Sequence, residues 1–298
     1  MERQTTVKSR VSCRGIGLHS GKNVRLELIP AAENTGIVFI RKDRKGVRIP
    51  ADPFHLVPTA FCTTLEADGV TVQTVEHLLA AIMAVGIDNL TVAIDGPEVP
   101  VLDGSALPFV SLLMEAGVER QSHIKSCIEF IRPVTVSCAD KCVTISPSSS
   151  FEISCQIRFE HPLLAYQEYD YTHSRDAFIR EIAPARTFGF LKDVPWLLSQ
   201  GLAKGGSLEN SVVIGEDDIL NKEGMRFPDE FVRHKVLDLI GDLALLGMPM
   251  VGRVEAVSSG HRMHALLIQK ILEETSAWRV THTEEVSPYP LSHALLLR

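Results

Sequence analysis

The 298-residue sequence lacks the features that mark membrane-spanning proteins, secreted proteins and general nucleic-acid binders. It has no apolar run near the ~18 residues that a membrane-spanning helix requires. The segment 1–8 has no apolar core of a signal peptide. Lys and Arg do not outnumber Asp and Glu, and the net charge of −7 argues against general nucleic-acid binding. These absences predict a cytoplasmic protein with no transmembrane segment and no nucleic-acid partner.

The cysteines are not spaced for a structural metal. None of the six cysteines forms a C-x-x-C pair, and Cys138 and Cys142 have no second pair at zinc-finger spacing. A chain of this length also buries enough surface to fold without disulfides. We therefore expect reduced, mostly buried thiols.

The two halves of the sequence show a similar order of strands and helices. In the first half, alternating apolar residues predict a strand around 24–28. A helical pattern then begins after Thr74, a candidate cap, and stops at Gly86. A strand over 89–94 and a helix that ends near Gly117 complete this half.

The second half has a similar outline. Strands are predicted at 128–136, 142–146 and 151–159, a helix at 175–182, a helix from Asp229 to Gly247, a strand at 251–257 and a last helix over 265–272. Each half thus contains a helix, a glycine stop, a strand, a turn and a second helix. This repeat predicts an α+β fold of two related domains, each a layer of helices on a sheet.

A short motif strengthens the repeat. Val75-Glu76-His77 in the first half matches Val232-Arg233-His234 in the second. If the two helices pack face to face, the two histidines approach each other.

The second of these helices carries a stripe of metal-ligand types. His234, Asp238 and Asp242 are spaced i, i+4 and i+8, which places them along one edge of a helix. An imidazole and a carboxylate at i, i+4 can bind one metal ion, as paired histidines do in zinc helices. A catalytic zinc needs a third protein ligand, and His77 on the matching helix is the natural candidate. Its neighbour Glu76 can act as a general base toward a water molecule.

These residues also have ordinary explanations. A histidine near the start of an amphipathic helix is commonly a surface residue or a cap, and an acid at every fourth position is commonly a solvated face. The segment 231–243 is otherwise strongly apolar, and acids in such a helix tend to be paired or metal-bound. From the spacing alone, both explanations stay open.

Five motifs in this order identify a resemblance. They are Val75-Glu76-His77-Leu78, Asp103-Gly104-Ser105, Ala185-Arg186-Thr187-Phe188-Gly189-Phe190, Phe231-Val232-Arg233-His234-Lys235 with Asp238 and Asp242, and Ser259-Gly260-His261. Over residues 3–280 the chain resembles the UDP-3-O-acyl-N-acetylglucosamine deacetylases, the zinc enzymes of lipid A biosynthesis. The resemblance implies two β-α-α-β sandwich domains packed together, with the active site between them. It also implies hydrolysis of the N-acetyl group of UDP-3-O-acyl-N-acetylglucosamine, which gives UDP-3-O-acyl-glucosamine and acetate.

The resemblance further implies a role for each matching residue. His77, His234 and Asp238 would bind one Zn²⁺ per chain, and Glu76 would be the general base. Fe²⁺ or Co²⁺ are also expected to fit such a site, because affinity alone discriminates poorly between these ions.

Three further positions match the catalytic residues of the family. His261, oriented by Asp242, would be the cationic general acid, and Thr187 would hydrogen-bond the oxyanion. A helix N-terminus near His261 would favour the neutral imidazole, whereas Asp242 would favour the charged one. We therefore expect Asp242 to keep His261 protonated.

Substrate contacts are also implied by the resemblance. Lys141, Phe159 and Glu160 match positions that contact the UDP group, with Phe159 stacked on uracil. Lys235 is placed to contact the substrate near the sugar or its phosphate, and Phe188 is also expected to contact the substrate. Without the resemblance, Lys141 and Phe159 would be read as an exposed lysine and a strand core residue.

A β-α-β insert near 190–214 matches the segment of the family that holds the acyl chain. The candidate lining residues are Leu191, Val194, Ala203, Gly206, Ser207 and Val213. A small satellite core would have the same apolar content, so the acyl-chain length cannot be read from it.

The predicted organisation is a first domain over 1–124, a second over 125–280 and a C-terminal tail over 281–298. His264, near the site, and the tail have no assigned role. We expect a monomer.

Two other functions stay open on the residues: a metal-dependent hydrolase of another amide or ester, and a sugar-nucleotide binder with a decayed site. The complete set of ligand and acid–base residues argues against the binder.

Overall fold

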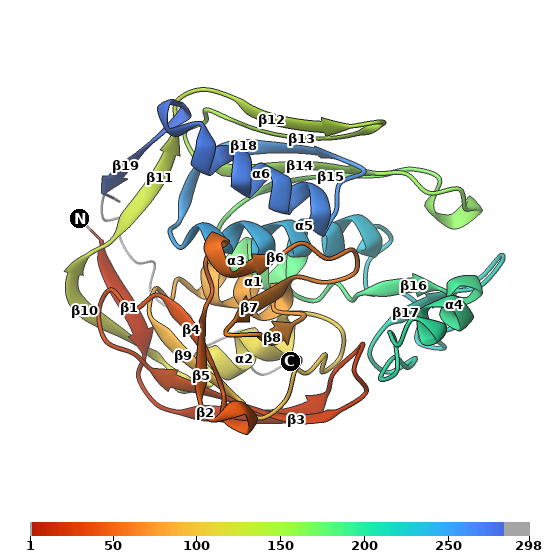
Figure 1. The fold of residues 1–298 in the computed structure, drawn as a ribbon. Coiled ribbons are helices and arrows are strands. Elements are labelled where there is room, and N and C mark those ends of the chain that lie inside the picture. Colours follow the sequence, from red (N-terminus) through yellow and green to blue (C-terminus); the bar gives the residue numbers. More distant parts are fainter. Residues whose placement is uncertain (1, 283–298) are drawn as a thin grey trace.

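The computed structural model describes residues 2–282 and places two sheets on either side of a central layer of helices (Figure 1). The predicted α+β class is confirmed. No helix among the described residues has the length and apolar character that crossing a membrane requires.

The first sheet has five strands. Their order is β2 (Val11–Ile16), β3 (Asn23–Pro30), β9 (Leu90–Ile94), β4 (Ile37–Arg41) and β5 (Val47–Pro50). The predicted alternation holds in β3, where Val24, Leu26 and Leu28 face the core and are buried. A smaller sheet and a strand pair flank it: β6 (Leu56–Val57), β7 (Thr64–Ala67) and β8 (Val70–Gln73), and β1 (Arg3–Val7) with β10 (Val118–Ile124).

The second sheet has seven strands, and β18 (Met250–Val257) is its centre. This strand pairs with β13 (Lys141–Ser146), β14 (Phe151–Ile157) and β11 (Ser126–Phe130). The outer strands are β12 (Val134–Cys138), β15 (Gln167–Thr172) and β19 (Trp278–His282). The predicted single strand over 128–136 is wrong. It is two strands, β11 and β12, because Pro133 between them has no N–H for a sheet ladder.

The central helices are α1 (Glu76–Val85) and α2 (Leu107–Ala116) from the first half, and α5 (Glu230–Leu243) and α6 (His261–Glu273) from the second. A short α3 (Arg175–Ala177) continues as a π-helical turn to Ile182. Gly86 and Gly247, at positive φ, end α1 and the turn that follows α5, as predicted. Nearly every residue of α1 is buried, as expected for a helix whose residues after His77 are all apolar.

The predicted Thr74 cap is wrong. The Thr74 hydroxyl donates to Glu98 Oε1 at 2.8 Å, and the residue has a positive φ of 56°. Helix α1 begins two residues later, after Val75, without a side-chain cap. The buried Glu98 carboxylate needs hydrogen-bond donors, and the Thr74 hydroxyl is one of them.

The close crossing of α1 and α5 determines where the site lies. A Cβ atom on Gly241 of α5 would lie 2.0 Å from the carbonyl oxygen of Glu76 in α1, so only glycine allows this approach. The crossing brings the rings of His77 and His234 to 4.9 Å between centroids. The expected approach of the two motif histidines is therefore confirmed.

The segment between β16 (Phe188–Phe190) and β17 (Val212–Ile214) projects from the body of the molecule (Figure 1). The two strands pair in parallel over three residues each, and α4 (Val194–Ser199) connects them. This is the β-α-β order predicted for 190–214, and we call it the insert. The two large sheets are built from residues before 95 and after 125; the division into domains at 124 and 280 stays a prediction.

Candidate metal and catalytic site

Three buried side chains converge where α1 crosses α5. His77 comes from the first turn of α1, and His234 and Asp238 come from consecutive turns of α5. The Nε2 atoms of His77 and His234 lie 3.6 and 3.3 Å from Asp238 Oδ1. The ligand atoms of the three residues all lie within 4.8 Å of one another, and their side chains are only 2–4% exposed. We call these residues the metal triad.

The chemistry of the triad fits a divalent metal ion. Asp238 Oδ1 is buried and has no hydrogen-bond partner among the described residues, a costly state that a cation would relieve. His234 Nδ1 lies 3.1 Å from the Ala185 carbonyl, so Nδ1–H donates there and Nε2 is left as the ligand atom. Burial lowers the pKa of His234 to about 3, which keeps its imidazole neutral. Two imidazoles and a carboxylate are a typical catalytic zinc set.

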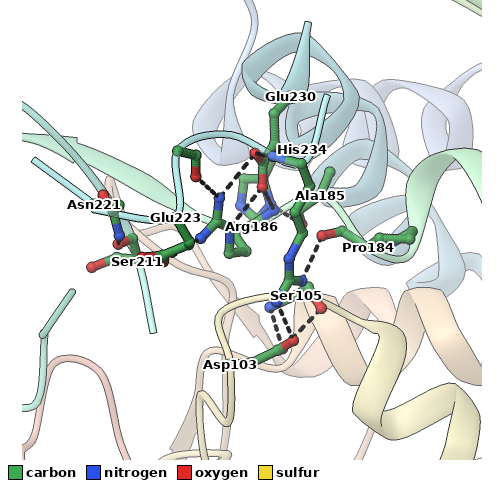
Figure 2. A network of polar contacts seen from close by, with 12 residues as sticks. Asp103, Ser105, Pro184, Ala185, Arg186, Ser211, Asn221, Glu223, Glu230 and His234 are labelled. Atoms are coloured by element: carbon green, nitrogen blue, oxygen red, sulfur yellow. Dashed lines mark hydrogen bonds and ion pairs between the residues drawn. The ribbon is translucent and has the colours of Figure 1, made fainter. Parts of the chain in front are cut away.

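A network of ion pairs holds the start of α5 against the loop that contacts His234 (Figure 2). Glu230, fully buried at the start of α5, accepts hydrogen bonds from the Arg186 backbone N–H and Nε at 3.0 and 2.9 Å. Arg226 donates from its Nη2 to Asp103 Oδ2 at 2.9 Å and from its Nη1 to the Pro184 carbonyl. The network therefore connects the Asp103-Gly104-Ser105 motif to the loop that fixes His234.

Glu76 lies beside the triad in a position suited to proton transfer. It is buried, and its Oε2 accepts a hydrogen bond from the Thr63 backbone N–H at 3.0 Å. Burial raises its pKa to about 7, although the charges of His261 and His77 oppose the rise. A carboxylate with this pKa can gain and lose a proton near neutral pH.

His261, the first residue of α6, approaches from the other side. Its Nδ1 lies 2.8 Å from Asp242 Oδ2, and its Nε2 lies 3.9 Å from Asp238 Oδ2. Burial lowers the pKa of His261, but the charge and hydrogen bond of Asp242 outweigh burial and raise it to about 9. The structure therefore keeps a protonated imidazole beside the triad at neutral pH.

These groups share one cavity. Its lining consists of Leu18, His19, Ala60, Phe61, Thr74, Glu76, His77, Thr187, Phe188, His234, Lys235, Asp238, Gly260 and His261. The predicted residues Thr187, Phe188 and Lys235 thus join the triad, Glu76 and His261. The Lys235 ammonium donates to Asp238 Oδ2 at 2.6 Å and lies 5.5 Å from the centre of the Phe188 ring.

Other predicted contacts lie outside this lining. Lys141 and Glu160 are exposed, Lys141 at the first position of β13 and Glu160 beyond the end of β14. Phe159 is half-buried, and its ring centroid lies 5.9 Å from that of Phe188 and 5.6 Å from that of Phe190. Phe159 is therefore connected to the cavity through an aromatic neighbour.

The six predicted insert residues also lie outside the cavity lining. They are Leu191, Val194, Ala203, Gly206, Ser207 and Val213. The insert meets the cavity wall through several contacts. The Ala203 N–H donates to His19 Nδ1 at 3.4 Å, and the Trp196 and Phe61 rings have centroids 5.8 Å apart.

Sequence reasoning missed Thr63 and His19 and left His264 unassigned. The Thr63 hydroxyl donates to Asp242 Oδ1 and lies 3.2 Å from His261 Nδ1, while His19 is buried at the cavity wall. Both residues lie in loops without periodicity, so no local signal marks them. His264, noted but unassigned, lies 2.6 Å from Asp242 Oδ2; its i+3 spacing from His261 on α6 is a signal that was available.

The chain is similar to known proteins over most of its length. Residues 4–273 match the sequence model of a family described as UDP-3-O-acyl N-acetylglycosamine deacetylase. A UDP-3-O-acyl-N-acetylglucosamine deacetylase of Myxococcus xanthus is 48% identical over 278 residues, which are 93% of this chain and 88% of the relative. Proteins of the same name from Pseudomonas entomophila and Vibrio parahaemolyticus are each 45% identical, over 98% and 99% of this chain and 98% of each relative.

Proposed function

This chain belongs to the UDP-3-O-acyl-N-acetylglucosamine deacetylase family, and on that premise we propose how its cavity carries out the reaction. The protein is a hydrolase that removes the N-acetyl group of UDP-3-O-acyl-N-acetylglucosamine in lipid A biosynthesis. The products are UDP-3-O-acyl-glucosamine and acetate. The roles of individual residues below are our proposal.

His77, His234 and Asp238 would hold one Zn²⁺ per chain. The support is the buried Asp238 Oδ1, which has no hydrogen-bond partner among the described residues, and the hydrogen bond that directs His234 Nε2 toward it. When bound, the metal would polarise the substrate carbonyl and lower the pKa of a water molecule. Fe²⁺ or Co²⁺ would fit the same donor set.

Glu76 is the proposed general base. Its carboxylate takes a proton from the water that attacks the acetyl carbonyl carbon. A pKa near 7 suits this role, because the ionised form is available at neutral pH and still binds a proton well. The Thr63 N–H holds Oε2 and so orients the carboxylate.

His261 is the proposed general acid. The attack gives a tetrahedral oxyanion in the substrate, and its C–N bond breaks as the nitrogen receives a proton. His261 Nε2 is the donor, since Nδ1 is already engaged by Asp242. The Thr187 hydroxyl, on the cavity wall, would donate a hydrogen bond to the oxyanion.

Substrate binding involves surfaces beyond the cavity. Phe159, Glu160 and Lys141 would contact the UDP group, and Lys235 and Phe188 the sugar side of the substrate. The insert, through residues such as Leu191 and Gly206 and the others predicted for it, would hold the acyl chain. The exposed apolar side chains of the insert support this assignment. A monomer stays our prediction, and so does a cytoplasmic location.

The meeting of the metal triad, Glu76 and His261 in one cavity is the observation that carries this proposal. The test is acetate release from UDP-3-O-acyl-N-acetylglucosamine by the zinc-loaded protein, with Glu76→Gln as the matched control. Turnover by the wild type and loss of turnover with retained zinc in the variant are expected. Absence of turnover by fully loaded wild-type protein would contradict the proposal.

A further inference from the structure

The catalytic scheme uses one of the two histidines that contact Asp242. His264 lies three residues after His261 on α6 and is only 1% exposed. Its Nδ1 lies 2.6 Å from Asp242 Oδ2, the same oxygen that contacts His261 Nδ1 at 2.8 Å. Its other nitrogen, Nε2, lies 2.9 Å from Ser259 Oγ. His264 is not among the residues that line the cavity.

The hydrogen bonds determine how His264 is arranged. An ionised carboxylate only accepts hydrogen bonds, so Nδ1 of His264 must carry a proton and donate to Asp242. In the neutral tautomer, Nε2 then accepts from the Ser259 hydroxyl. A neutral imidazole thus satisfies both contacts, and no charge on His264 is needed.

Each carboxylate oxygen of Asp242 accepts a hydrogen bond from a residue other than His261. The Thr63 hydroxyl donates to Oδ1, and His264 Nδ1 donates to Oδ2. A rotation of the carboxylate would break both contacts, and each would leave a buried polar group without a partner. With His264 removed, only Thr63 and His261 itself would hold the carboxylate.

We propose that His264 is a positioning residue: through its Nδ1–H it fixes the Asp242 carboxylate and thereby the orientation of His261. It acts on the reaction only through these two residues, and the inference rests on the proposed role of His261. The alternative is a buried histidine that contributes only to packing. The two differ in what a substitution does to kcat in a protein that stays folded.

The chain allows a matched set of variants. In His264→Asn the amide nitrogen can occupy the place of Nδ1 and still donate to Asp242. In His264→Gln the amide reaches the place of Nε2 and keeps only the contact with Ser259. His264→Leu keeps apolar volume and neither contact. His55→Leu removes a histidine whose Nδ1 lies 2.7 Å from Asp52, outside the cavity, and serves as the control.

The first readout is steady-state kinetics of the zinc-loaded variants, with zinc content and melting temperature measured on the same samples. His264→Leu and His264→Gln should lower kcat by about 10- to 100-fold, the range known for outer-shell partners in metal sites, with KM and zinc content unchanged. His264→Asn should keep most of the wild-type kcat, as should His55→Leu. Equal loss in His264→Asn and His264→Leu, or unchanged kcat in His264→Leu, would overturn the proposal. If His264→Leu does not fold, the contrast between the Asn and Gln variants decides.

The second readout does not depend on turnover. In protein with ¹⁵N-labelled histidine, the Nδ1–H signal of His261 reports its hydrogen bond to Asp242. This signal should persist in His264→Asn, and it should shift or exchange with water in His264→Gln. An unchanged signal in His264→Gln would refute the positioning role. If the wild type shows no deacetylation, the proposed function fails, while the signal still tests whether His264 orients His261.

Discussion

The catalytic cavity and the insert are built in opposite ways. In the cavity the metal triad and Glu76 are buried, as is Asp242 behind His261, and their side chains contact one another or the backbone. In the insert, Leu191, Trp196 and Leu198 are 49%, 53% and 48% exposed. The proposed reacting groups are therefore positioned before any substrate binds, whereas the apolar side chains of the insert have surface left to cover.

This contrast separates two kinds of effect on the kinetics. Changes in preorganised groups should act on kcat, because those groups work in the transition state. Changes in the insert should act on KM, because contacts with a remote part of the substrate are made equally in the ground and transition states.

Removal of a ligand from the metal triad should abolish activity. In His234→Ala the site keeps only two ligands, so turnover should fall below detection. Wild-type protein at a free zinc concentration of about 1,000 times Kd should gain about 4 kcal/mol in free energy of unfolding. The variant should show no such gain, as measured by thermal unfolding with zinc and with a chelator. Full zinc binding and normal turnover in His234→Ala would contradict the triad.

Loss of the general base should leave the metal in place. Glu76→Gln keeps the shape of the side chain but cannot take a proton, so kcat should fall by about 10²- to 10⁴-fold. Zinc content, measured by metal analysis, should equal that of the wild type. Loss of zinc in this variant would make Glu76 a ligand, and the base would then have to be another group.

The pH profile should depend on Asp242. Glu76 must be ionised, so kcat/KM should rise as pH passes its pKa of about 7. His261 must be protonated, so kcat/KM should fall as pH passes its pKa of about 9. In Asp242→Asn the charge that raises the pKa of His261 is gone and burial lowers it, so the alkaline limb should move to lower pH and kcat should fall. An alkaline limb that stays in place would show that another group is the acid.

Local patterns predicted the helices that carry this site. The apolar period of α5, with acids at every fourth position, marked His234, Asp238 and Asp242 as one edge of a helix. The matching motif on α1 pointed to His77. What made their approach possible is Gly241, whose missing side chain allows the two backbones to touch.

Long-range contacts could not be read in this way. Thr63 reaches Asp242 across 179 residues of sequence, from a loop with no periodicity. Thr74 was predicted to cap a helix, but its hydroxyl donates a hydrogen bond to the distant Glu98. The periodicity of a helix or strand reports the face that it buries, and it does not identify the partner on that face.

The insert should control binding of the acyl chain. Gly206 is exposed, and a Cβ atom there would lie 3.7 Å from Cδ1 of Leu18, a cavity-lining residue. Gly206→Trp should therefore narrow the space between the insert and the cavity and raise KM for the acylated substrate about tenfold, or about 1.4 kcal/mol. Zinc content and kcat should stay near wild type. The non-acylated UDP-N-acetylglucosamine is the control, since its KM should not change. Equal effects on both substrates would place the obstruction at the sugar rather than at the acyl chain.

The smallest effect should come from Lys141, a predicted contact that is exposed and outside the cavity lining. Its ammonium is exposed at the start of β13, so an ion pair with the diphosphate of the substrate would be largely solvated. Exposed pairs contribute about 0.2–1 kcal/mol, so Lys141→Ala should raise KM by at most about fivefold. Because salt screens such pairs, the difference from wild type should shrink as ionic strength rises toward about 1 M. Lys42→Ala, an exposed lysine next to the first sheet, should leave KM unchanged at every salt concentration. A rise in KM for Lys141→Ala that persists at high salt would mean that the substrate buries this lysine. The hairpin of β12 and β13 would then belong with the preorganised cavity and not with the surfaces that the substrate covers.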